Sequence, residues 1–189
     1  MSIQRQTQLM ELGHDGVSGA QATITTDRLD IHSGVGFTAS SYDVMTTGEV
    51  VVFCFTTPTV NYVHFKNIHI KTLGGSVKVE ILKGADVTAN AGTALPVLNM
   101  NHVSDNAGTV TVKLAPTYTG GTVWFDAYSL ADVTNQSTGI GSFTQSDNKE
   151  LVMKNGGEQY IFVITNLETE NVPFYMRAFW YESPNGLNS

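Results

Sequence analysis

The chain has 189 residues, of which 41% are hydrophobic and 14% charged, so it holds enough apolar material for one domain with a buried core. Its net charge of −7 and its 10 scattered Lys and Arg residues argue against nucleic acid as a partner, because phosphate binding needs clustered cations. No stretch approaches the ~18 consecutive apolar residues of a transmembrane helix, so we expect no membrane partner either.

Residues 1–29 are polar, and their few apolar side chains follow no sustained period. We predict an N-terminal arm that is either disordered or docked on a neighbour. Its candidate contacts with a partner or a sister subunit are Ile3, Leu9, Met10 and Leu12. The opening "MSIQRQTQLMELGHDG" lacks the pattern of a secretory signal, so we expect a protein made in a cytoplasm and released, if at all, by a route such as host lysis.

Residues 30–189 form the second predicted unit, which is rich in β-branched and aromatic residues separated by turn residues. We expect strands, in chain order, at 49–57, 60–72, 74–84, 95–101, 109–116, 120–130, 150–154, 159–167 and 172–182. Short strands at intervals of about ten residues are typical of an antiparallel sandwich or barrel. The fold class is therefore all-β.

Two of these strands carry a clear facial pattern. In 60–72 the apolar face switches between Phe65 and Ile68, which predicts a bulge or bend near Lys66 and Asn67. In 74–84 the apolar residues Val77, Val79 and Ile81 share one face.

The glycine pairs Gly74–Gly75, Gly120–Gly121 and Gly156–Gly157 supply the positive φ angles of tight turns. We expect each pair to close a hairpin between neighbouring strands.

Candidate metal ligands are sparse. His64 and His69 are five positions apart in one strand, so an unbroken strand points them to opposite faces, although a bulge would bring them to one face. A third ligand would then have to come from Glu80 or His102. Since no compact ligand pattern exists, we expect no metal and no cofactor.

Candidate catalytic groups are equally isolated. Asp30, His32 and Ser33 are nearly consecutive and suit a turn better than a hydrolase triad. Glu168 and Glu170 suit a solvated turn better than a glycosidase pair. The segments 86–93 and 104–109 lack the spacing of a calcium loop. We therefore expect no catalytic residue and no enzyme.

The single cysteine, Cys54, lies in the apolar run "VVVFCF" and is expected to be a buried, inert thiol. A set of aromatic residues offers either core or an exposed sugar-binding platform, and we favour core: Trp124, Tyr128, Phe174, Tyr175, Phe179, Trp180 and Tyr181.

Three groups of stretches carry a family resemblance: "DIHSGVGFTASS" with "TPTVNYVHFK", "VKVEILKGADVTANAGTALPVLNMNHVS" with "PTYTGGT", and "ELVMKNGGEQYIFVITNLETENVPFYMRAFWYE". Together they resemble small structural proteins of tailed bacteriophages, the capsid decoration or cement proteins, over roughly residues 27–182.

The resemblance implies a jelly-roll-like β-sandwich that assembles as a homo-oligomer, often a trimer, on the outer capsid surface of the virion. The implied partners are the major capsid protein and further copies of the chain, and assembly would take place in the host cytoplasm. The alternative is a head-fibre, tail or receptor-binding component of the virion that binds glycans through exposed aromatic residues.

Overall fold

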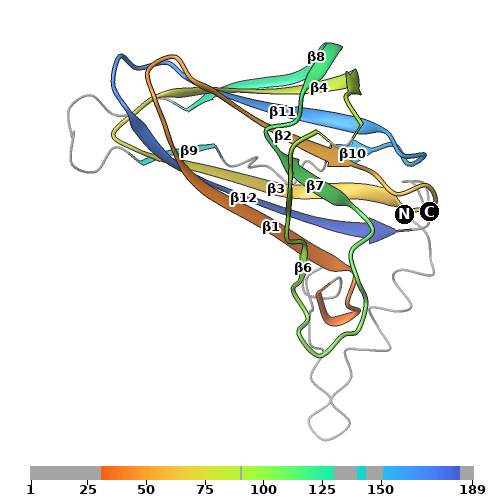
Figure 1. Cartoon of the computed structure of the whole chain (residues 1–189). Coiled ribbons are helices and arrows are strands. Elements are labelled where there is room, and N and C mark those ends of the chain that lie inside the picture. Colours follow the sequence, from red (N-terminus) through yellow and green to blue (C-terminus); the bar gives the residue numbers. More distant parts are fainter. Residues whose placement is uncertain (1–30, 90, 130–139, 144–150, 184–189) are drawn as a thin grey trace, which may run out of the picture.

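The computed structural model describes residues 31–89, 91–129, 140–143 and 151–183, which fold into two antiparallel β-sheets (Figure 1). The strands are β1 (Gly36–Met45), β2 (Val50–Thr56), β3 (Tyr62–Leu73), β4 (Val77–Val87), β5 (Thr93–Leu95), β6 (Leu98–Asn99), β7 (Thr111–Leu114), β8 (Tyr118–Ser129), β9 (Ile140–Phe143), β10 (Leu151–Met153), β11 (Gln159–Asn166) and β12 (Val172–Ser183). The predicted all-β sandwich is confirmed. No helix in the described part of the chain is long and apolar enough to cross a membrane.

The two sheets face each other as layers (Figure 1). The first has the order β10–β3–β12–β1–β6, with β9 also paired to β3, and the second has the order β5–β7–β2–β11–β4–β8. The chain crosses between layers at most steps, for example from β1 to β2, from β2 to β3 and from β11 to β12. Sequence neighbours are therefore mostly partners across the core.

This winding corrects the hairpin prediction. Gly74–Gly75 joins β3 to β4, and Gly156–Gly157 joins β10 to β11; both connections cross from one sheet to the other. Gly120–Gly121 lies inside β8. Most of these glycines do adopt positive φ, with Gly74 at 76° and Gly156 at 103°, but a sharp corner needs that conformation whether or not the flanking strands pair.

The glycines inside β8 bend a two-stranded ribbon. Gly84 (φ 66°) and Gly121 (φ 99°) lie between two register pairs of β4 and β8, Lys83 with Thr122 and Ala85 with Gly120. The ribbon ends beyond this bend carry Ala85, Val87 and Tyr118, which pack on the outer side of the second sheet. They form a small second core there with further apolar side chains, the buried ones being Cys54, Ile161 and Val163.

The main core lies between the two sheets. Val77, Val79 and Ile81 are fully buried, as their alternation predicts. At its centre the ring of Phe55 lies 4.6 Å from that of Phe162 and 5.9 Å from that of Trp180, so both layers contribute to one aromatic cluster.

The predicted bulge in β3 is confirmed. Phe65 pairs with Trp180 and Asn67 pairs with Phe179, which leaves Lys66 as the extra residue. The extra residue shifts the alternation of side chains along the rest of β3, so that Ile68 points into the same core as Phe65.

Strand β1 is the main element that the sequence pattern misses. Its sequence GFTASSYDVM alternates weakly, yet it pairs with β12 over its whole length and buries Phe37, Ala39 and Met45. The predicted strand 95–101 is also two short strands, β5 and β6, in different sheets, separated by Pro96.

Candidate functional site

Several candidates from the sequence fall outside the described residues. Ile3, Leu9, Met10, Leu12 and Asp30 belong to them, as does the boundary between the predicted arm and the sandwich. Residues 31–34, which include the other two members of the candidate triad, form a turn before β1. In this turn the Gly34 amide donates a hydrogen bond to the Ile31 carbonyl at 3.0 Å. Both His32 and Ser33 are exposed in this turn.

The bulge does bring His64 and His69 to one face of the first sheet, since they pair with Tyr181 and Arg177 of β12. Four residues of strand separate these partners, a distance of about 13 Å, which one metal ion cannot span. No group of three or more His, Cys, Asp or Glu side chains able to hold a metal occurs among the described residues.

The acidic turn before β12 has a structural task. The Glu168 carboxylate accepts a hydrogen bond from the Ser76 amide at 2.8 Å, which ties this turn to the β3–β4 connection. Glu170 is exposed. Cys54 is buried as predicted, and burial raises the pKa of its thiol.

The aromatic set divides between core and surface. Phe174 and Trp180 are core residues, and Tyr181 is buried on the outer side of the first sheet, where its ring stacks 4.4 Å from that of His64. Tyr128 and Tyr175 are exposed, at 57% and 37%. The core interpretation therefore holds for only part of the set.

The exposed Tyr175 belongs to a larger surface on the outer side of the first sheet, which we call the cationic face. It consists of the exposed and partly exposed outward side chains of β1, β12 and β3: Thr38, Ser40, Tyr42, Val44, Lys66, His69, Lys71, Leu73, Pro173, Tyr175, Arg177 and Phe179. The cross-strand register aligns Tyr42 with Tyr175, and Ser40 with Arg177.

The cationic face contains no carboxylate, although the chain as a whole is acidic. The two acids on these three strands, Asp43 and Glu182, occupy the inward register; Glu182 is buried, whereas Asp43 is exposed near the end of β1. The pKa of His69 on this face is lowered, mainly by burial and to a smaller extent by the positive charges of Lys71 and Arg177.

The aromatic residues, the arginine and the absence of acids on this face are features that protein interfaces share, whereas its two lysines are not. Tyrosine, phenylalanine and arginine are enriched at the cores of interfaces, where acidic residues are depleted. The exposed apolar surface here includes Tyr42 at 68% and Leu73 at 61%. The face is also stiff, because the β1–β12–β3 ladders hold its side chains in register.

A second candidate is a cavity of about 520 Å³ between the edges of the two sheets. It is lined by residues of β4, β8, β10 and β11 and of the β10–β11 connection: Lys83, Gly84, Thr122, Trp124, Val152, Lys154, Glu158 and Tyr160. Strand β8 is the edge of one sheet and β10 that of the other, so the cavity marks one open side of the sandwich.

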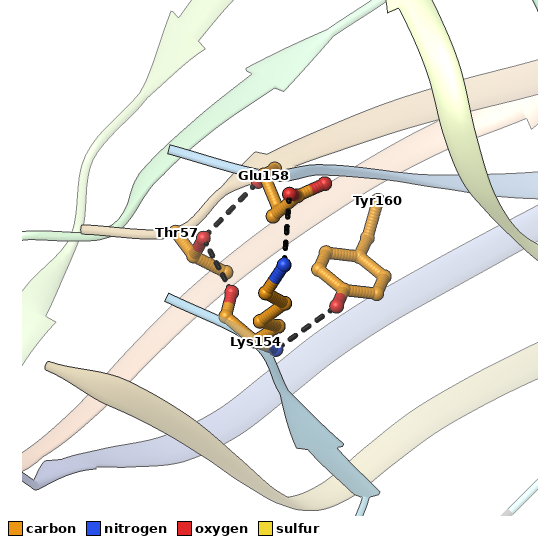
Figure 2. Close-up of polar contacts among 4 residues, drawn as sticks. All are labelled: Thr57, Lys154, Glu158 and Tyr160. Atoms are coloured by element: carbon orange, nitrogen blue, oxygen red, sulfur yellow. Dashed lines mark hydrogen bonds and ion pairs between the residues drawn. The ribbon is translucent and has the colours of Figure 1, made fainter. Parts of the chain in front are cut away.

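Figure 2 shows how the wall of this cavity is held. The Lys154 amide donates to the Tyr160 hydroxyl at 2.9 Å, and the Thr57 hydroxyl donates to the Lys154 carbonyl at 2.8 Å. Burial raises the pKa of Tyr160. The Lys154 ammonium lies 3.8 Å from the Glu158 carboxylate, a loose ion pair between exposed side chains.

Neither surface is visible in the sequence as a motif. The cationic face needs the pairing of three strands far apart in the chain, and the only local signal is the period-two spacing of Tyr42–Val44, His69–Lys71 and Tyr175–Arg177. Comparison of the chain with protein families, with curated proteins and with solved structures finds no match.

Proposed function

We propose that the protein is a structural virion protein that binds the outer surface of a tailed-phage capsid and stabilises the head. The observation that carries the proposal is the cationic face, a rigid, carboxylate-free array of tyrosine and arginine on an otherwise acidic protein. The family resemblance of the three quoted groups of stretches supplies the identity of the partner, the major capsid protein.

A protein of this kind acts by thermodynamic linkage. It binds the assembled shell and not its dissociated subunits, so each bound copy lowers the free energy of the assembled state. Presentation of several cationic faces by a homo-oligomer, as a trimer would do, adds avidity without tight single contacts. The four apolar arm residues, Ile3, Leu9, Met10 and Leu12, would extend the contact to the capsid or to a sister subunit.

The strand order supports a jelly roll as the type of sandwich. With β5, β6, β7 and β9 set aside, one sheet has the order β1–β12–β3–β10 and the other β2–β11–β4–β8. Two four-stranded sheets in which the chain keeps crossing between layers correspond to a double Greek key. Three of the four strands set aside, β5, β6 and β7, lie in an insertion between β4 and β8.

The test is cosedimentation of the purified protein with phage particles assembled without it. We expect the wild type to bind and the double variant Tyr42→Ala/Tyr175→Ala to bind at least ~30-fold more weakly, because truncation of a hot-spot tyrosine at the centre of an interface costs about 2 kcal/mol or more. Tyr128→Ala is the matched control, an exposed tyrosine on the other sheet. Absence of wild-type binding would refute the proposal. Equal binding of the wild type and the double variant would show that the cationic face is not the binding surface.

The alternative, a head-fibre, tail or receptor-binding component, is favoured by a different observation. The cavity at the open side of the sandwich carries Trp124 and Tyr160 with polar groups around them, as a glycan-binding protein would need.

A further inference from the structure

We propose that the cavity between β8 and β10 is a saccharide-binding site in which Trp124 stacks on the face of a pyranose ring. The inference uses no part of the decoration proposal and stands or falls separately from it. It gives a location and a chemistry to glycan binding by this chain.

A backbone irregularity builds the site. The register between β4 and β8 shifts between Ile81 and Leu82, and Trp124 is the extra residue on β8. A bulge of this kind re-aims a side chain out of the regular alternation. Trp124 consequently lies on the same side as Phe125, with both side chains packed against the main core and only partly buried. The indole thus has one anchored side and one accessible side.

The indole has a fixed neighbour. Its ring lies 5.5 Å from the ring of Tyr160 at an interplanar angle of 50°, so the two aromatics form a corner. Tyr160 is held in place by burial and by the hydrogen bond from the Lys154 amide to its hydroxyl (Figure 2). Thr57 bonds the Lys154 carbonyl and lies 3.2 Å from that of Glu158, which holds both ends of the turn beside the corner. The aromatic wall is therefore formed before any ligand arrives.

Polar groups surround this wall. Lys83 and Thr122 come from the paired strands β4 and β8 and offer an ammonium and a hydroxyl. Lys154 and Glu158 offer a second ammonium and a carboxylate, and their 3.8 Å ion pair is loose enough to rearrange around a ligand. The cavity thus presents both donors and acceptors within reach of one aromatic face.

These features together match the chemistry of a saccharide ligand. A pyranose has an apolar C–H face that suits the electron-rich face of an indole, and a rim of hydroxyls that each donate and accept hydrogen bonds. The volume of about 520 Å³ is within the range of roughly 300–1,000 Å³ for small-ligand sites. Two lysines beside one glutamate make a weak field, which suits a neutral or singly charged sugar better than a polyphosphate.

The experiment begins with the full chain on an array of mono- to tetrasaccharides, followed by fluorescence titration of the strongest binder. The protein has two tryptophans, and Trp180 is fully buried, so acrylamide quenching reports selectively on Trp124. We expect bound sugar to protect Trp124 from the quencher. We also expect Lys83→Ala and Thr122→Ala, two exposed positions, to weaken binding by about twofold to tenfold each.

Trp124→Ala, followed by the array and by calorimetry, should weaken binding about tenfold or more. Tyr128→Ala is the matched control, an exposed aromatic four residues along the same strand and outside the cavity lining, and it should bind as the wild type does. Failure of every saccharide to bind, or binding that survives both Trp124→Ala and Lys83→Ala, would overturn the inference. Neither result would bear on cosedimentation with particles, so the two proposals fail independently.

Discussion

Glu182 provides the sharpest test of how the long β6–β7 connection is held to the sandwich. Its carboxylate is 5% exposed and accepts hydrogen bonds from the amides of Thr109 at 2.9 Å and Val110 at 3.1 Å. It also accepts from the Thr109 hydroxyl and, at 3.4 Å, from the indole N–H of Trp180. One inward-facing acid near the end of β12 thus ties down the segment that leads into β7.

Glu182→Ala should destabilise the protein by about 3 kcal/mol. The change leaves two buried donors without a partner, the Val110 amide and the Trp180 indole N–H, at about 1–3 kcal/mol each. The long Trp180 contact places the sum in the lower half of that range. The donors of Thr109 add little, because this residue is exposed and its groups can bond to water.

Glu182→Gln should cost much less, about 1 kcal/mol, because the Oε1 atom that accepts from both Val110 and Trp180 can remain a carbonyl oxygen. The assay is urea unfolding followed by Trp fluorescence, with the exposed Glu170→Ala as control at within about 0.5 kcal/mol of the wild type. A loss below about 1 kcal/mol for Glu182→Ala, or equal losses for Ala and Gln, would refute the reasoning.

Three further predictions use other parts of the structure. Gly92→Ala should lower the melting temperature in calorimetry, because φ is 83° and the new Cβ would lie 2.6 Å from the Leu114 carbonyl oxygen; an unchanged melting temperature would contradict this. Cys54 should react with a thiol reagent only after unfolding, since it is buried and its pKa is raised by that burial; fast labelling of the native protein would show otherwise. The pKa of His69 is lowered in the folded protein, so the unfolded chain binds a proton at this residue more readily. The free energy of unfolding should therefore decrease as the pH is lowered from about 7.5 to about 5. In urea unfolding at the two pH values, His69→Gln should show a smaller decrease than the wild type. An identical decrease in the variant would show that His69 does not contribute to the pH dependence.

Local patterns were sufficient for much of the fold. The alternation of Val77, Val79 and Ile81 predicts the inner face of β4, and the change of face between Phe65 and Ile68 predicts the bulge at Lys66. Both are properties of one strand and need no knowledge of its neighbours. The burial of Cys54 follows in the same way from the apolar run around it.

Features that depend on distant partners could not be predicted. Strand β1 forms because β12 offers it a ladder over ten residues, not because GFTASSYDVM alternates strongly. The glycine pairs mark sharp corners, and the sequence does not say whether a corner returns to the same sheet or crosses to the other. The cationic face and the cavity both combine strands that are far apart in the chain, so neither exists as a motif.

The arm before residue 30 remains a prediction, because its residues lie outside the described ranges. Removal of residues 1–25 should leave the unfolding of the sandwich unchanged while particle binding is lost. Full binding by the truncated chain would assign the contact to the sandwich alone.

The central claim is tested most directly by the copy number of this protein on density-purified phage particles from its source, measured by quantitative mass spectrometry against the major capsid protein. A decoration protein should be present at a copy number comparable with that of the capsid protein. A few copies per particle would assign it to a tail or a vertex fibre instead, and its absence from the particles would contradict the proposed function altogether.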